Sequence, residues 1–321
     1  MPAEKPDSRS VRHAAPGLRI CLIGLALLVF FLPSWAQGQI TSGTRPPSND
    51  EQYTLQLINQ ARSSADGLAV LQRFVSNNLA AIVPSTTRDS IDGTPWSTNF
   101  WTSPIPGVAS NMNYFRVHPG DLKRQFMELV IPNYPLTWHP NLGQAASGYN
   151  AIVIASNGSG AGFPHNLAPY QASGTFAEFA KRNTDAGYGP LSDISALAEN
   201  IAPNNLSNAL SRFAAFMVDW GNSANGIQDQ NPASGSHRLT IMDDLFTEVG
   251  ISSLPGWGSG NTTEVQEFGK RLSTRVYVTG AVYHDSNNDG FFTWGRRQSP
   301  RLPSAVAPPG RRLPPALGAT L

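Results

Sequence analysis

The chain has 321 residues, of which 40% are hydrophobic and 14% are charged, with 29 Gly and 26 Pro. This composition is typical of a globular protein with long loops, and the length suffices for about two domains of average size. The net charge of +1 conceals an uneven distribution, because basic residues concentrate at both ends of the chain. Without residues 1–36 and the five Arg that follow Gly295, 14 Lys and Arg remain against 20 Asp and Glu. Such a mildly acidic body argues against a nucleic-acid-binding surface.

The first 36 residues have the organisation of an export signal. Three Arg precede an apolar run of 13 residues at 20–32, and Ala36 offers a small residue for cleavage. Because this run is short for a membrane span, residues 1–36 are predicted to be a cleaved signal peptide of a secreted or cell-surface protein. An uncleaved N-terminal anchor is the alternative. The only cysteine, Cys21, lies within the run, so the mature protein would fold without disulfides.

The next segments alternate between loop-like and helical patterns. Gly, Ser, Thr and Pro dominate residues 37–49, which predicts a linker. A helix is expected to begin near Asn49 or Asp50, with acids in its first turn that suit the helix dipole. Residues 84–120 show no sustained periodicity, and a stretch of this kind indicates an insertion. Its aromatic side chains are expected mainly to pack the insertion onto the domain, although they could also line a binding groove.

Two later segments have the apolar spacing of helices. One follows Pro140, and the other begins near Ser207 and reaches Trp220. His139, just before the first of them, is interpreted as a surface or cap residue and not as a ligand.

One acid and two histidines are the residues best suited to chemistry. Glu199 and Asn200 lie between small and apolar residues, where a carboxylate loses water and needs a cation, a metal or a proton as its partner. His165 follows a glycine-rich turn upstream, and His237 follows a polar loop downstream. Both histidines could provide that partner.

The order of these segments resembles that of the CAP domain, also called the SCP or pathogenesis-related-1 domain of secreted proteins. The resemblance covers about residues 50–270. It implies an α+β protein: an α/β/α sandwich with a small, mostly antiparallel sheet and long loops. The segments that carry it are Leu57–Arg62 (LINQAR), 135–146 (PLTWHPNLGQAA), 199–200 (EN), the helix ending at Trp220, 237–238 (HR), 248–251 (EVGI) and 264–269 (EVQEFG).

In that family the corresponding residues face one cleft. The resemblance therefore implies a site made of His165, Glu199 and His237, with Asn200 beside them. The two histidines could hold Zn²⁺, and Glu199 is the candidate catalytic base. Many family members have a second Glu shortly after the Trp, where this chain has 221–223 (GNS), so the four-residue cluster is incomplete.

Three functions are compatible with these residues. The first is a secreted CAP-domain protein that binds a lipid or an extracellular polymer in the cleft. The second is a metal-dependent extracellular hydrolase, conceivably a peptidase, that uses the same cluster. In either case the polar cluster could also be a purely structural hydrogen-bond network. The third function, a fragment of a surface adhesin, rests on the C-terminal segment.

Residues 275–295 resemble the start of the calcium-binding B-type β-sandwich repeats of bacterial surface proteins. Asp285, Asn287 and Asp289 have the spacing of oxygen ligands in a Ca²⁺ loop, and a Gly follows. An arginine occupies the place of the usual bidentate acid, which opposes calcium binding. The composition then changes at 296–321, which hold six Pro, five Arg and no acid, and predict a disordered basic linker or a non-native tail.

Overall fold

The computed structural model describes residues 40–156, 165, 167, 170, 176–204, 206, 208–228, 236–256 and 262–273. The predicted signal peptide at 1–36 lies outside the described residues. So do the predicted repeat at 275–295, with its loop of Asp285, Asn287 and Asp289, and the tail at 296–321.

The described residues form helices and a small mixed sheet, which confirms the α+β class. Among them, no helix combines the length and the apolar character that a membrane span requires. The helices are α2 (Asn49–Arg62), α3 (Gly67–Gln72), α4 (Val108–Tyr114), α5 (Pro119–Met127), α6 (Pro140–Ala155), α7 (Phe176–Asp185), α8 (Ala209–Val218) and α9 (His237–Met242). The strands are β1 (Thr137–Trp138), β2 (Ile194–Asn204), β3 (Glu248–Pro255) and β4 (Thr262–Arg271).

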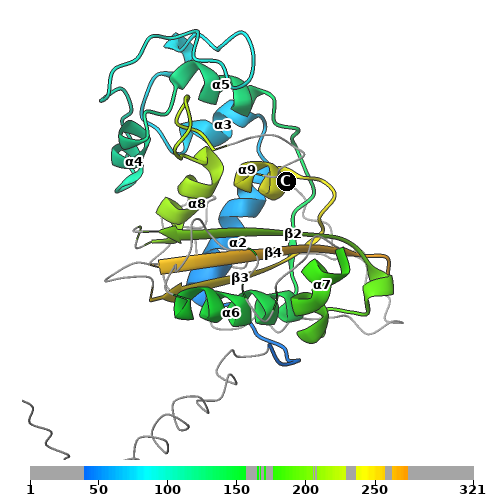
Figure 1. Ribbon diagram of the computed structural model, residues 1–321. Coiled ribbons are helices and arrows are strands. Elements are labelled where there is room, and N and C mark those ends of the chain that lie inside the picture. The colour runs from blue at the N-terminus through cyan, green and yellow to red at the C-terminus, as the bar shows by residue number, and fades with distance from the viewer. Residues whose placement is uncertain are drawn as a thin grey trace, which may run out of the picture. The chain divides into compact units, whose positions relative to one another are not determined.

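The four strands lie in the order β1-β3-β4-β2, so β2 is at one edge. β1 pairs parallel to β3, and the other two pairings are antiparallel. Figure 1 shows α6 and α7 on one side of the sheet and α2, α8 and α9 on the other, with α3, α4 and α5 farther from it. Each face of the sheet therefore has its own helical cover.

Side chains on β2 alternate between these two covers. Ile201 packs with Tyr149 of α6 in one apolar cluster. Ala196 belongs to the larger cluster that contains residues of α2 and α8, and Ala198 packs against that cluster. Successive residues of a strand point to opposite faces. Glu199 and Asn200, adjacent in sequence, are therefore directed into different layers.

The close approach of α6 to the sheet depends on Gly250 of β3, which has no side chain. A Cβ added at Gly250 of β3 would lie 2.0 Å from the backbone nitrogen of Gly143 in α6. Only glycine at this strand position lets the helix backbone come so near. The small residues Ala145 and Ala146 of α6 are fully buried in the same layer.

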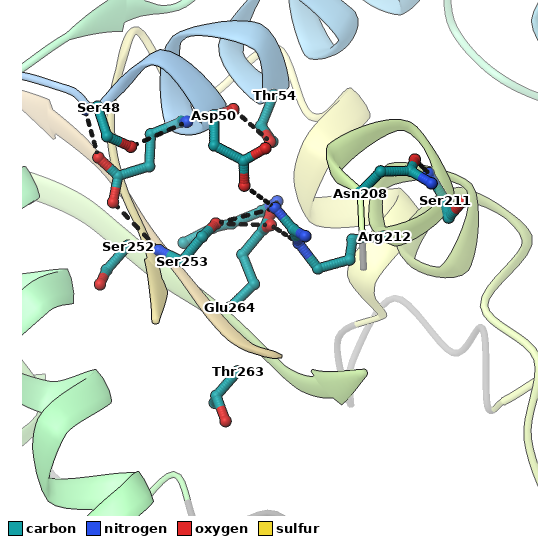
Figure 2. A network of polar contacts seen from close by, with 12 residues as sticks. Ser48, Asp50, Thr54, Asn208, Ser211, Arg212, Ser252, Ser253, Thr263 and Glu264 are labelled. Carbon is teal, nitrogen blue, oxygen red and sulfur yellow. Dashed lines mark hydrogen bonds and ion pairs between the residues drawn. The ribbon is translucent and has the colours of Figure 1, made fainter. Parts of the chain in front are cut away.

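The first helix begins at Asn49, as predicted, and is tied to the sheet by a charged network (Figure 2). Ser48 caps the helix and forms a capping box with Glu51. Arg212 of α8 contacts the carboxylate of Asp50, and its Nε lies 2.8 Å from Oε2 of Glu264 on β4. This network joins two helices to the strand that they cover.

The part of the predicted linker that is described, residues 40–48, packs against the domain. Ile40 is only 4% exposed, and its N–H donates to the hydroxyl of Tyr170 at 2.8 Å. Arg45 forms an ion pair with Glu51 at 2.5 Å. These contacts make residues 40–48 a packed arm of the domain.

The irregular segment at 84–120 contains α4 and the start of α5, and an aromatic residue anchors it. Trp101 is 2% exposed, and its indole N–H donates to the carbonyl of Val117 at 2.7 Å. Packing is thus confirmed as the role of Trp101, whereas Tyr114 is 79% exposed. His139 is confirmed as a cap, because its Nδ1 accepts from the N–H of Asn141 at the start of α6.

Candidate functional site

Glu199 of β2 is paired with His165, as the resemblance implies. Nδ1 of His165 lies 2.7 Å from Oε1 of Glu199. The two side chains differ in access to solvent, since His165 is 47% exposed and Glu199 only 1%. The histidine therefore lies over a carboxylate that solvent does not reach.

The second oxygen of Glu199 is bound by an arginine that the sequence did not single out. Arg182 of α7 places one terminal nitrogen 2.7 Å from Oε2 of Glu199. Its Nε lies 2.8 Å from Oε1 of Glu267, which is directly opposite Glu199 on β4. All three side chains are at most 2% exposed. One buried cation thus serves two buried carboxyl groups.

The pKa values of these two carboxyl groups are shifted in opposite directions. Burial disfavours charge on both, but Arg182 and His165 outweigh it at Glu199 and lower the pKa of that carboxyl. At Glu267, burial and the negative charge of Glu199 prevail, and they raise the pKa well above its ordinary value. Glu267 therefore keeps its proton to a higher pH than Glu199 does, and when the pair holds one proton it lies on Glu267, which donates a hydrogen bond to Glu199.

An aromatic ring covers the arginine. The guanidinium of Arg182 lies 4.0 Å from the centroid of the Tyr149 ring on α6. Burial and the nearby Glu199 raise the pKa of Tyr149 to about 12, so the phenol stays neutral. Its hydroxyl accepts the N–H of Leu167 at 3.0 Å, two residues beyond His165. The network therefore also holds the segment that carries His165.

His237, the first residue of α9, binds a different acid. Its Nδ1 lies 2.7 Å from Oδ1 of Asp219, and the ring also donates to the carbonyl of Ile201. Burial works against charge on the ring, but the Asp219 carboxylate outweighs it and raises the pKa of His237. Asp219 is 1% exposed and ends α8 in the left-handed region at φ 60°. A non-glycine residue in that region is strained and is retained where its side chain is needed.

Asn200 belongs with His237 and not with Glu199. Its side-chain amide donates to the backbone carbonyl of His237 at 3.2 Å and to Oε1 of Gln266 at 3.1 Å. It therefore fixes the start of α9 against β2 and β4. The strand alternation explains why Asn200 and Glu199, one residue apart, have entirely different partners.

The expected three-residue cluster of His165, Glu199 and His237 is thus divided into two His–acid pairs. Within the parts of the chain that are described, no three His, Cys, Asp or Glu side chains are grouped so as to hold a metal ion. A protonated imidazole also has no lone pair for Zn²⁺, and the Asp219 carboxylate favours that state of His237. The residues present do not fit a Zn²⁺ site that uses both histidines.

A hollow of about 450 Å³ lies beside α9, on the side of β2 opposite to Glu199. Its apolar lining consists of Leu129, Val130, Ala198, Leu239, Met242 and Phe246. A hollow of this volume with a largely apolar lining has the size and character of small-molecule and side-chain binding sites. Sequence reasoning did not find it, because its lining comes from three separate segments, 128–133, 198 and 239–246.

Sequence reasoning missed Asp219 and Arg182, and it did not assign Glu267 to the site. Asp219 immediately precedes Trp220, so an acid was present beside the Trp where family members have one after it. Arg182 lies one helical turn from Phe179 on the amphipathic helix α7. A basic residue among apolar ones on a helix face is a weak signal for a buried ion pair, and nothing in the sequence connects it to Glu199.

Comparisons with known proteins add no identification to this geometry. No protein-family model, curated protein or solved structure matches the chain. The assignment of the two His–acid pairs and of the hollow therefore rests on the contacts within the described residues alone.

Proposed function

We propose that the chain is an exported protein of the CAP type that acts by binding an extracellular ligand, without turnover. The order of the sequence motifs supports this, together with helices on both sides of a small sheet (Figure 1). In this proposal the fold is the α/β/α sandwich of that family. The His165–Glu199 network is structural, because it holds a loop to the sheet.

The observation that carries the proposal is the state of Glu199. A general base must reach its substrate proton directly or through one water and must be free to accept it. Oε1 of Glu199 is hydrogen-bonded to His165, Oε2 lies 2.7 Å from the cationic Arg182 in an ion pair, and the side chain is 1% exposed. A carboxylate in this state stabilises its neighbours and is poorly placed to activate water.

The hydrolase alternative needs a metal site that these residues do not supply. His237 is held by Asp219 on the other side of β2, away from the carboxylate of Glu199. Metal analysis of the purified protein tests the point. We expect less than stoichiometric Zn²⁺ and the same unfolding midpoint with and without a chelator. Stoichiometric Zn²⁺ that is lost in His165→Ala would instead support the hydrolase.

The hollow beside α9 is the proposed binding site. Its apolar lining suits the non-polar part of a lipid or of an extracellular polymer. The neutral dye N-phenyl-1-naphthylamine, which fluoresces in apolar surroundings, serves as the probe. We expect saturable fluorescence with the full chain and its loss in Ala198→Leu, which fills the hollow. Ala177→Leu, at an exposed site of α7, is the matched control and should leave the signal unchanged.

Export is part of the same proposal and has its own test. If residues 1–36 are a signal peptide, protein recovered outside the producing cell should begin at residue 37. Sequencing the N-terminus of the exported protein measures this. Intact residues 1–36 in membrane-bound protein would favour the anchor alternative.

A further inference from the structure

Several large apolar side chains that solvent reaches belong to the hollow beside α9 or come next to its lining residues in the chain. Met127, Val130 and Tyr134 lie on or beside the segment that follows α5, and they are 54%, 73% and 84% exposed. Leu245, in the loop after α9, is 45% exposed. The same two segments supply lining residues of the hollow, including Val130. We call the hollow together with these four side chains the α9 surface. Apolar side chains gathered in this way mark interaction sites more often than scattered ones do.

The α9 surface has negative charge on one side. Asp243 and Asp244 line the hollow, and Asp244 is exposed. Within the described residues, no cationic side chain forms an ion pair with either carboxylate. Buried Arg62 lies behind the loop, but its guanidinium donates to backbone carbonyls, among them that of Asp243. It weakens the negative field without bonding to either carboxylate.

The third acid of the lining is already neutralised. Glu128 forms ion pairs with Arg88 at 2.9 Å and with Arg124 at 3.0 Å. Among the described lining residues, the carboxylates that form no ion pair are therefore Asp243 and Asp244, which lie on one side of the hollow. A ligand that spans the hollow would meet apolar side chains along its length and carboxylates at one side.

The extent of the apolar side chains favours a polypeptide over a small amphiphile. A hollow of about 450 Å³ accommodates one large side chain or a small ligand. Val130 lines the hollow and is 73% exposed, so it extends the apolar area beyond what such a ligand would cover, and the exposed Tyr134 follows the lining residue Asn133 in the chain. A chain that inserts one apolar anchor and lies across the surrounding side chains would bury both parts.

We propose that the α9 surface docks an extended segment of a partner polypeptide that carries Lys or Arg next to an apolar residue. The apolar side chain enters the hollow lined by Leu239, Met242 and Phe246, and the basic side chain pairs with Asp243 and Asp244. This inference rests on the proposed function and specifies its ligand: the extracellular polymer is a basic, apolar polypeptide.

The test uses the full chain and a short fluorescein-labelled peptide of alternating Lys and Leu, with binding followed by anisotropy. Peptides of alternating Lys and Ser, and of alternating Glu and Leu, remove the apolar and the basic component in turn. We expect only the first peptide to bind. Asp244→Asn should weaken binding by about two- to fivefold at low salt, as for an exposed ion pair. Asp185→Asn, which removes an acid from α7, is the charge-matched control and should have no effect.

Two further variants test the apolar part. Ala198→Leu fills the hollow and should weaken binding by about tenfold or more, as for loss of an interface anchor. Val130→Ser acts at a side chain that is 73% exposed, so it should weaken binding without affecting folding. Equal loss of binding in Asp185→Asn and Asp244→Asn would overturn the charge assignment. Unchanged binding in both Ala198→Leu and Val130→Ser would overturn the docking site.

Other occupants give different results. Dye binding that depends on the hollow, together with no binding of any peptide, would leave the proposed function intact and overturn the polypeptide ligand. Binding to phosphatidylcholine vesicles in preference to peptide would identify a lipid surface instead. Self-association in sedimentation that is reduced by Val130→Ser would identify a second copy of the chain. Failure of dye and peptides alike would remove the proposed site itself.

Discussion

Exchanging each carboxyl of the buried pair for its amide, singly and together, tests how Arg182 is held. Gln occupies nearly the same volume as protonated Glu and can donate the same hydrogen bond. Glu267→Gln therefore imitates the protonated state that Glu267 already has beside Glu199. We expect its free energy of unfolding to match that of the parent within about 1 kcal/mol near pH 4, and to exceed it at pH 7, where the parent must take up a proton at Glu267 on folding.

Glu199→Gln should also be tolerated, for a different reason. Without the negative charge of Glu199, Glu267 can ionise and become the counter-ion of Arg182, 2.8 Å away. The cost is then mainly the charge-assisted hydrogen bond from His165, which we place at about 1–2 kcal/mol. Each single variant keeps one anion next to one cation.

The double variant leaves Arg182 without an anion. Its guanidinium is 2% exposed, and removal of the partner of a buried charge costs about 3–5 kcal/mol. That is a large part of the roughly 5–15 kcal/mol available to a folded domain. The double variant should therefore lose about 2 kcal/mol or more beyond the sum of the single variants.

Urea unfolding, followed by tryptophan fluorescence at pH 7 and checked by circular dichroism, measures all four free energies. The pH dependence adds a second readout. Glu267 holds its proton in the folded state above pH 4.5, where the unfolded chain has lost it, so stability falls as pH rises from there. Glu267→Gln removes this decline. Additive costs in the double variant, with a coupling below about 0.5 kcal/mol, would refute the shared-cation arrangement.

Two further predictions concern the other His–acid pair and the packing of α6. Asp219→Asn should remove the contact that raises the pKa of His237. A raised histidine pKa stabilises the folded state below about pH 6.5, and this stabilisation is lost as pH rises through the folded pKa. Urea unfolding should therefore show a larger loss of stability in the variant at pH 5.5 than at pH 8. NMR titration of His237 should show its pKa falling, and an unchanged value would contradict the assignment. Gly250→Ala should destabilise by about 3 kcal/mol or more, since its Cβ would lie 2.0 Å from backbone of α6. Gly43→Ala, whose Cβ would meet nothing nearer than 3.8 Å, is the matched control for thermal unfolding.

The sequence alone was sufficient where the signal is local. Hydrophobic period and the acids of the first turn predicted a helix that begins near Asn49 or Asp50, and His139 was interpreted as a surface or cap residue. Both predictions depend on neighbours within about one helical turn. The α+β class was predicted from the resemblance to the CAP domain. The pairing of His165 with Glu199 was also predicted, although from the resemblance and not from chemistry in the residues themselves.

Tertiary structure decided which acid each histidine binds and where a ligand has room. Successive residues of a strand point to opposite faces of the sheet, so Glu199 and Asn200 lie in different layers and have partners on different helices. Arg182 and Asp219 meet their partners only when α7 and α8 pack on the sheet. The hollow beside α9 exists only where three distant segments come together. Contacts of this kind depend on the packing of distant elements, which local sequence patterns do not encode.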